Sequence, residues 1–217
     1  MGPLSHVPIS DALIIFFLTL GPLKAIAPFA QLTQGTDPAF RRAVAWRATT
    51  IATVIVFAVA LVGTLVLENW HVSIAAIVIT ASLILFCQAF QLIMQPLAAA
   101  PSPTPPGASQ SPPSLEIAHF PVAIPILVTA PGIAAIAGAM AIAAGNWTQK
   151  GIVFAALLVI MGLNLVTLLN IEVISKRGSP PMQRVFGWVM AVLQAALAAQ
   201  YIINGLVRLG ALPQVIL

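Results

Sequence analysis

The sequence predicts an all-α membrane protein with six transmembrane helices. Hydrophobic residues form 60% of the 217-residue chain and charged residues only 6%, whereas a soluble domain carries roughly 25% charged residues. Six apolar runs are each long enough to cross a bilayer, which takes roughly 20 residues of helix. Tryptophan favours the headgroup region, and all four tryptophans lie near the ends of these runs. They are Trp46, Trp70, Trp147 and Trp188.

The six runs are at about 10–34, 43–67, 72–95, 118–145, 149–171 and 184–208. No stretch shows the alternation of apolar and polar residues that is typical of a transmembrane barrel. Residues 1–10 lack lysine and arginine. We therefore expect no cleaved signal peptide, and a first run that stays in the protein.

Basic residues predict the orientation of the spans. Six of them lie in the connections after runs one, three and five or beside them, whereas Lys150 and Arg208 lie on the other side. Because cytoplasmic loops carry the excess of lysine and arginine, this assigns the first side to the cytoplasm and both termini to the outside. The net charge of +4 thus reflects topology, and no nucleic-acid partner is expected. The six residues are Arg41, Arg42, Arg47, Lys176, Arg177 and Arg184.

A proline-rich connection divides the chain into two halves of three runs each. We interpret residues 96–117 as a flexible cytoplasmic linker between residues 1–95 and residues 118–217. A binding tail for a proline-recognising partner is the alternative. Because three is odd, the halves cross the membrane in opposite directions, as inverted repeats do. A shift of 109 positions aligns the runs in order and places Pro22 on Pro131.

Proline and glycine interrupt the first run of each half. Proline removes a backbone donor, and a broken helix is tolerated at membrane depth only where protein or a watery cavity surrounds it. Matching breaks in two halves indicate a transporter's binding site, with N–H groups for an anion and carbonyls for a cation. The alternative is that the prolines only kink packed helices. The interruptions are Gly21-Pro22 and Pro28 in the first run, and Pro121, Pro125 and Pro131-Gly132 in the fourth.

Lys24 lies within the first run. Inserting a lysine at the centre of a membrane helix costs roughly 2.5–3.5 kcal/mol of free energy. It lies about 10 residues from the cytoplasmic end, roughly 15 Å along a helix, which is too far for easy snorkelling. We therefore expect its ammonium to face a cavity or to pair with a substrate carboxylate. The alternative is a structural lysine that caps carbonyls freed by Pro28.

These considerations define a candidate substrate site at mid-depth between the two interrupted runs. Thr19 and Thr129 are favoured because each neighbours an interruption. Other polar residues inside the runs, such as Gln88, Asn164 and Gln194, are expected to make helix–helix hydrogen bonds, and the alternative is that they line a transport pathway. The candidate site residues are Thr19, Gly21, Pro22, Lys24, Pro28, Pro125, Thr129, Pro131, Gly132 and Asn204.

Enzymatic chemistry has no basis in this sequence. The three histidines are far apart, so the sequence predicts no metal site. Neither a serine–histidine pair at membrane depth nor a phosphate-binding glycine loop is present, and no cofactor is expected. No acidic residue lies at mid-depth, so Lys24 and Glu172 are the visible candidates for a proton carrier.

Residues 21–29, GPLKAIAPF, resemble the N-P-x-G-x-x-P-x-F motif of the MarC family of bacterial integral membrane proteins. Both prolines and the phenylalanine match, whereas Gly21 replaces the asparagine and Lys24 the glycine. Three further segments resemble the family's arginine-rich segment, its fourth helix and its last helix. They are RRAVAWRA at 41–48, PVAIPILVTAPGIAAI at 121–136 and RVFGWVMAVLQAALAAQYIINGL at 184–206.

The resemblance implies six helices in a bacterial inner membrane. With the orientation that the basic residues predict, both termini are then periplasmic. Some related members are taken to export small neutral amino acids, so the resemblance also implies a transporter, and an exporter, of small amino acids or similar solutes. H⁺ or another coupling ion is a candidate partner. The added charge of Lys24 would favour a more acidic substrate or replace a coupling cation. The alternatives are a channel and a non-transporting scaffold or regulatory protein. Partners other than solute and lipid are open, including further copies of the chain.

Overall fold

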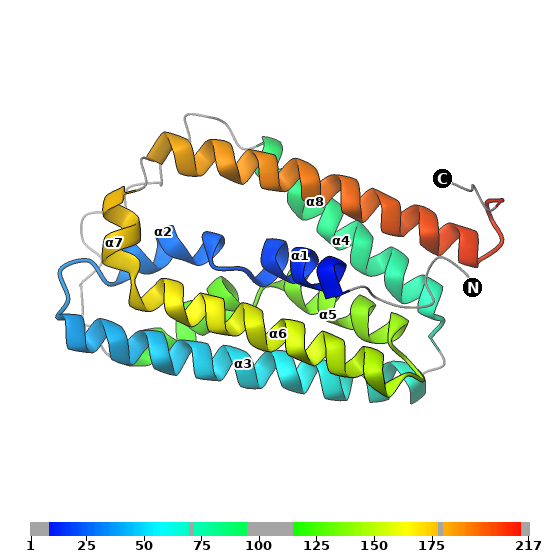
Figure 1. Ribbon diagram of the computed structural model, residues 1–217, viewed down its shortest axis with the longest axis horizontal. Coiled ribbons are helices and arrows are strands. Elements are labelled where there is room, and N and C mark those ends of the chain that lie inside the picture. Colours follow the sequence, from blue (N-terminus) through cyan, green and yellow to red (C-terminus); the bar gives the residue numbers. More distant parts are fainter. Residues whose placement is uncertain (1–8, 70–71, 95–114, 178–179, 214–217) are drawn as a thin grey trace.

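The computed structural model describes residues 9–69, 72–94, 115–177 and 180–213. Within these ranges every regular element is a helix, so the all-α class is confirmed. Figure 1 shows the helices along the bundle. They are α1 (Ile9–Leu20), α2 (Leu23–Leu32), α3 (Pro38–Asn69), α4 (Ile74–Met94), η1 (Leu115–Ala118), η2 (His119–Leu127), α5 (Ala130–Ile142), α6 (Trp147–Leu169), α7 (Ile171–Arg177) and α8 (Pro180–Arg208).

The helices agree with a multi-pass membrane protein. Among the described residues, five stretches are long and apolar enough to cross a membrane, and the bent pair of η1–η2 and α5 makes a sixth if it is one span. Helix α3 begins at Pro38, earlier than the predicted 43. The Asp37 carboxylate accepts a hydrogen bond from the Ala39 amide at 3.2 Å, and proline suits the first helical position.

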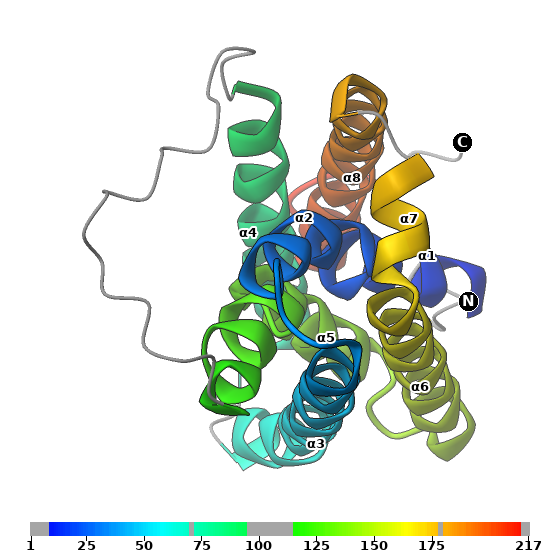
Figure 2. The same cartoon turned by 90° about the vertical axis from the view of Figure 1, so that its left-hand side faces the viewer.

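The first two helices occupy the centre of the bundle. Helix α1 contacts α5, α6 and α8, whereas α2 contacts η2, α6 and α7. Around them α4 packs along α8, and α3 packs along α6. The end-on view in Figure 2 shows α2 surrounded by the other elements. The elements that α1 and α2 contact here, η2 and α5 to α8, all belong to the second half of the chain.

Buried side chains gather around this junction. Phe16 on α1 and Phe29 on α2 are fully buried, together with Leu127 on η2 and Ile136 on α5. The outer surface is also apolar, and Leu65 on α3 is 66% exposed. Lipid contact explains such exposure in a bundle of membrane-spanning helices.

Small residues allow α4 to approach its neighbours closely. A Cβ atom on Gly205 of α8 would lie 2.5 Å from Ile79 Cγ1, and one on Gly138 of α5 would lie 3.3 Å from Ala81 Cβ. Gln194 on α8 adds hydrogen bonds from its amide to Leu85 O at 3.1 Å and to Gln88 Oε1 at 3.0 Å. Close packing and buried amide bonds are common means of membrane helix association.

Two groups of sequence predictions fall outside the described residues. Residues 95–114 contain most of the predicted linker. The division into residues 1–95, 96–117 and 118–217 therefore stays a prediction, as does the interfacial position of Trp70.

Candidate substrate site

The first helix is interrupted at Gly21 and Pro22. Helix α1 ends at Leu20 and α2 begins at Leu23, and Pro22 O accepts the first hydrogen bonds of α2 from the Ala25 and Ile26 amides at 3.0 and 3.2 Å. A Cβ atom on Gly21 would lie only 1.9 Å from Phe17 O, so this turn needs glycine. The last carbonyls of α1 thereby lose their usual helical donors.

Pro28 does not interrupt the helix, which differs from the sequence prediction. Helix α2 continues through Pro28 to Leu32. Ala25 and Phe29 beside it are 1% and 0% exposed, so core packing holds the helix around the missing hydrogen bond.

The second interruption lies between η2 and α5. Phe120 and Ile124 have extended backbone angles inside η2, as expected for residues that precede proline. The stretch from Leu115 to Leu127 is bent by 59° relative to α5. Pro121 and Pro125 therefore lie in irregular backbone, and Pro125 belongs to an element that packs against α2.

Thr129 caps the amino-terminal end of α5. Its hydroxyl oxygen accepts a hydrogen bond from the Gly132 amide at 3.1 Å. Pro131 occupies the first turn, where its missing N–H needs no helical partner. The cap leaves the positive end of the α5 dipole directed at the interruption.

The two interruptions meet in space. The Thr129 hydroxyl donates a hydrogen bond to Thr19 O at 3.0 Å, across 110 positions of sequence. A Cβ atom on Gly132 would lie 2.1 Å from Leu20 Cδ2, so glycine lets the two helix ends touch. The negative carboxyl end of α1 thus lies against the positive amino end of α5.

Asn164 on α6 adds a polar group that sequence reasoning did not place in the site. Its side chain is fully buried, and its amide nitrogen donates to Leu20 O at 2.8 Å and to Ile160 O at 3.0 Å. Its amide oxygen is buried without a hydrogen-bond partner. The only sequence signal is an asparagine inside an apolar run, which does not reveal a contact with Leu20.

Lys24 reaches the same helix end from the first turn of α2. Its ammonium lies 3.5 Å from Thr19 O, and its side chain is half-buried. The carbonyl that Pro28 deprives of a donor belongs to Lys24 itself, four residues earlier. The Lys24 ammonium therefore binds a carbonyl freed by the Gly21-Pro22 interruption. The structural alternative expected it to cap a carbonyl freed by Pro28.

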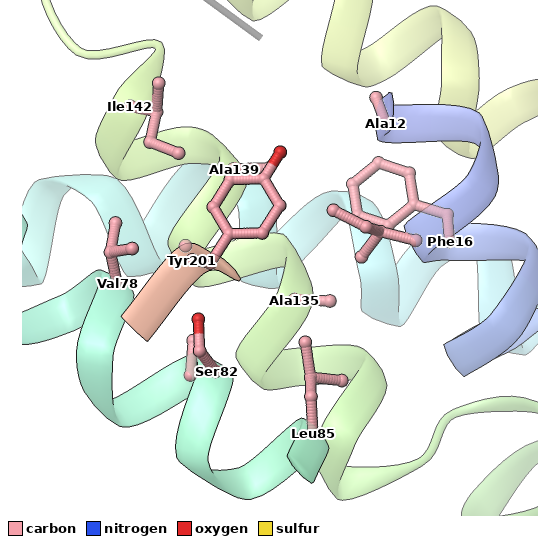
Figure 3. A pocket seen from close by; sticks show the side chains of 12 residues that line it. Ala12, Phe16, Val78, Ser82, Leu85, Ala135, Ala139, Ile142 and Tyr201 are labelled. Atoms are coloured by element: carbon pink, nitrogen blue, oxygen red, sulfur yellow. The ribbon is translucent and has the colours of Figure 1, made fainter. Parts of the chain in front are cut away.

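Several cavities lie along α1 and α4, and the one that Thr19 lines is next to the interruption. One of about 40 Å³ lies between α1, α4, α5 and α8, and Figure 3 shows the Ser82 and Tyr201 side chains among its apolar lining. A second, of about 10 Å³, is lined by Thr19, Gln194 and Tyr201. A larger space of about 290 Å³ lies between α4 and α5, and neither it nor the first cavity is lined by residues 19–22. Since one water needs roughly 10–15 Å³, the cavity beside Thr19 holds about one water and no amino acid. The described conformation is therefore closed around the interruption.

Asn204 is not part of this group. It lies on α8, and its amide oxygen accepts a hydrogen bond from Gln200 on the same helix at 3.1 Å. The structure thus brings seven of the ten candidate residues together and leaves out Pro28, Pro125 and Asn204. The residues at the meeting point are Thr19, Gly21, Pro22, Lys24, Thr129, Pro131 and Gly132.

Comparison with known proteins decides the family. A family model described as MarC family integral membrane protein matches residues 7–209. The chain belongs to the MarC family. A UPF0056 membrane protein of Archaeoglobus fulgidus is 28% identical over 200 residues, with 88% of each chain covered. One of Methanocaldococcus jannaschii is 28% identical over 190 residues, covering 88% of this chain and 91% of its own. No solved structure matches.

An ion pair joins the two halves of this MarC-family protein at one end of the bundle. Arg41 near the start of α3 pairs with Glu172 on α7, and its guanidinium also donates to Thr36 O at 3.2 Å. The Arg41 side chain is 16% exposed and that of Glu172 is 53% exposed. Partial exposure screens the attraction and keeps its contribution small.

We expect the Arg41–Glu172 pair to contribute about 0.5–1 kcal/mol of coupling energy. A double-mutant cycle of Arg41→Gln and Glu172→Gln, followed by denaturant unfolding in micelles, measures it. The charge swap Arg41→Glu with Glu172→Arg should recover part of the loss. Purely additive single effects would show that the pair contributes nothing.

Proposed function

We propose that this MarC-family protein is an inner-membrane carrier that exports small amino acids or similar small solutes. The supporting observation is the contact between Thr129 and Thr19, which brings the carboxyl end of α1 to the amino end of α5. Helix amino ends favour a carboxylate, and free carbonyls favour an ammonium or a cation. An amino acid has both groups, so a zwitterion matches this pair of helix ends.

The arrangement of the helices supports an inverted repeat, the architecture that carriers of this kind use. Trp147, which begins α6, follows Pro38, which begins α3, by 109 positions, the shift that aligns the two halves. The corresponding helices α3 and α6 contact each other, as do α4 and α8. Each pair runs in opposite directions along the bundle in Figure 1. Alternating access in such folds comes from movement around a fixed central site.

The closed state also fits a carrier. Side chains of the protein itself, from Thr129, Asn164 and Lys24, occupy the carbonyls of Thr19 and Leu20. A solute that enters must displace or rearrange these groups, which couples binding to helix movement. The export direction is proposed from the family resemblance, and the periplasmic termini are proposed from the distribution of lysine and arginine.

A liposome exchange assay tests the proposal. Purified protein in liposomes is loaded with one unlabelled amino acid, and uptake of a labelled panel is followed with and without a pH gradient. We expect exchange of small amino acids to exceed that of protein-free liposomes about tenfold. The reason is that a bound solute lets the closed carrier open to either side and release it.

A matched pair of threonine variants controls the assay. Thr129→Val removes the bonds to Thr19 O and from the Gly132 amide. Thr53→Val removes only a bond to Thr49 O in its own helix. We expect exchange to fall with the first and to persist with the second. Folded protein with no exchange across the panel contradicts the proposal, and ion flux faster than a carrier cycle would identify a channel.

A further inference from the structure

Two of the cavities lie one after the other along α1. Ala12 lines the cavity of about 40 Å³, Thr19 lines the cavity of about 10 Å³, and Ile15 between them lines both. Helix α4 shows the same order, since it contributes Val78 to the first cavity and only Leu85 to the second. The two spaces therefore extend from the first turn of α1 to its interrupted end.

Tyr201 on α8 lies between the two cavities. It lines both of them, together with Ile15 and Leu85. Figure 3 shows its ring extending into the first cavity, between Phe16 of α1 and Val78 of α4. A movement of this ring away from α1 would join the two spaces.

The Tyr201 hydroxyl is linked to the start of α1. Its charged partner is Asp11, whose carboxylate accepts a hydrogen bond from it. The same carboxylate accepts a hydrogen bond from the Ser10 hydroxyl at 3.1 Å. Both of these donors are neutral, so neither of them neutralises the carboxylate.

Asp11 is also unusual for its position. It lies in the first turn of α1, within a stretch long and apolar enough to cross a membrane. It is the only acidic residue of α1, α4, α5 and α8, the helices that surround the first cavity. Acidic residues within membrane spans mark the pathways of substrates and ions. The pair of Asp11 and Tyr201 therefore has both the place and the charge of an entrance.

We propose that solute reaches the interruption through these two cavities and that Tyr201, bound to Asp11, closes this route. The route opens at the start of α1, which is the outer side in the orientation that the basic residues predict. Asp11 then recognises the ammonium of an amino acid. A carboxylate binds a charged donor more strongly than a neutral hydroxyl, so the ammonium displaces Tyr201 and opens the route. The identity of the solute rests on the proposed function, whereas the route and its closure do not.

Cysteine labelling tests the route without any transport. The one cysteine of the chain, Cys87, is replaced by serine, and Ala198→Cys places a thiol in the second cavity, where Ala198 is 2% exposed. A membrane-impermeant methanethiosulfonate reagent is added to the outside of right-side-out vesicles, and the rate of thiol modification is measured. We expect Tyr201→Phe and Asp11→Asn each to raise this rate about tenfold, because each removes a hydrogen bond to a charged group that favours the closed state.

The matched control for this thiol is Ala52→Cys. Ala52 on α3 is fully buried and lines neither cavity, so its slow modification should not change in either variant. Because Tyr201→Phe and Asp11→Asn remove the same bond from opposite sides, the test remains decisive if one of them does not fold. An unchanged rate at Ala198→Cys in a folded variant overturns the proposal. So does an equal rise at Ala52→Cys, which would indicate loosening of the whole bundle.

Exchange of alanine and of N-acetylalanine in liposomes tests recognition by Asp11, because acetylation removes the ammonium charge and keeps the carboxylate. We expect wild type to prefer alanine about tenfold. Tyr201→Phe retains the Asp11 carboxylate and should keep this preference, whereas Asp11→Asn should lose most of it. An equal preference in the two variants would show that Asp11 does not recognise the ammonium.

The two experiments separate this proposal from the transport function. Faster labelling of Ala198→Cys in Tyr201→Phe, without exchange of any amino acid by wild type, would retain the route and its closure and reject the proposed function. Exchange by wild type with no change of labelling in the variants would retain the function and reject the route.

Discussion

Replacing Gly21 with alanine is expected to lower the free energy of unfolding by about 2–3 kcal/mol and to abolish exchange. The new Cβ atom would lie 1.9 Å from Phe17 O and 2.7 Å from Phe17 C. Because these are backbone atoms, no rotamer change relieves the collision, and the end of α1 must shift. A shift there separates Thr19 O from the Thr129 hydroxyl. The proposed binding site requires this contact. Denaturant unfolding in micelles and the liposome assay measure the two effects.

Gly162→Ala is the matched control for Gly21→Ala. Gly162 lies inside α6, and a Cβ atom there meets nothing within 4 Å. Alanine favours helix more than glycine does, so this variant should be neutral or more stable by up to about 1 kcal/mol. Equal stability of Gly21→Ala and wild type would show that the turn at residue 21 tolerates a side chain.

Replacing Asn164 with leucine is expected to lower the free energy of unfolding by about 1–3 kcal/mol and to reduce exchange strongly. The change removes the donor to Leu20 O, a carbonyl at an interrupted helix end, and leaves it buried without its partner. The loss should exceed the roughly 0.6 kcal/mol that is average for hydrogen bonds between membrane helices. Unfolding in micelles measures it.

The control for this residue is Asn170→Leu. Asn170 is the residue after α6, and its amide donates to Val166 O at 2.7 Å, four residues back in the chain. Its side chain is partly exposed, so the variant should change stability by less than about 0.5 kcal/mol. Equal losses at Asn164 and Asn170 would mean that the bond to Leu20 O has no special weight.

Much of this structure is predictable because hydrophobic length and proline position are local properties. The run at 72–95 contains α4, from Ile74 to Met94, and the glycine–proline pair at 21–22 separates α1 from α2. The meeting of Thr19 with Thr129 follows from the same argument, since each threonine neighbours an interruption. The orientation in the membrane stays a prediction, based on the distribution of lysine and arginine.

The errors arise where packing across the bundle decides the outcome. Pro28 alone predicts a break, but buried neighbours hold α2 intact. Asn164 makes the expected helix–helix hydrogen bond, but its partner Leu20 is 144 positions away and no pattern in either run indicates which residue it would be. Asn204 is polar and lies within a span, yet its hydrogen bond stays on its own helix. A single sequence does not specify which faces of distant helices meet.

The hydrogen bonds that cross between the halves also bear on biosynthesis. Thr19 O and Leu20 O receive their partners from Thr129 and Asn164, more than a hundred positions later. While the ribosome is still making the second half, these oxygens lie in a nascent chain that lacks both donors. The first three helices alone are thus an unfinished assembly, and the two halves produced as separate polypeptides should have to find each other in the bilayer before either is stable.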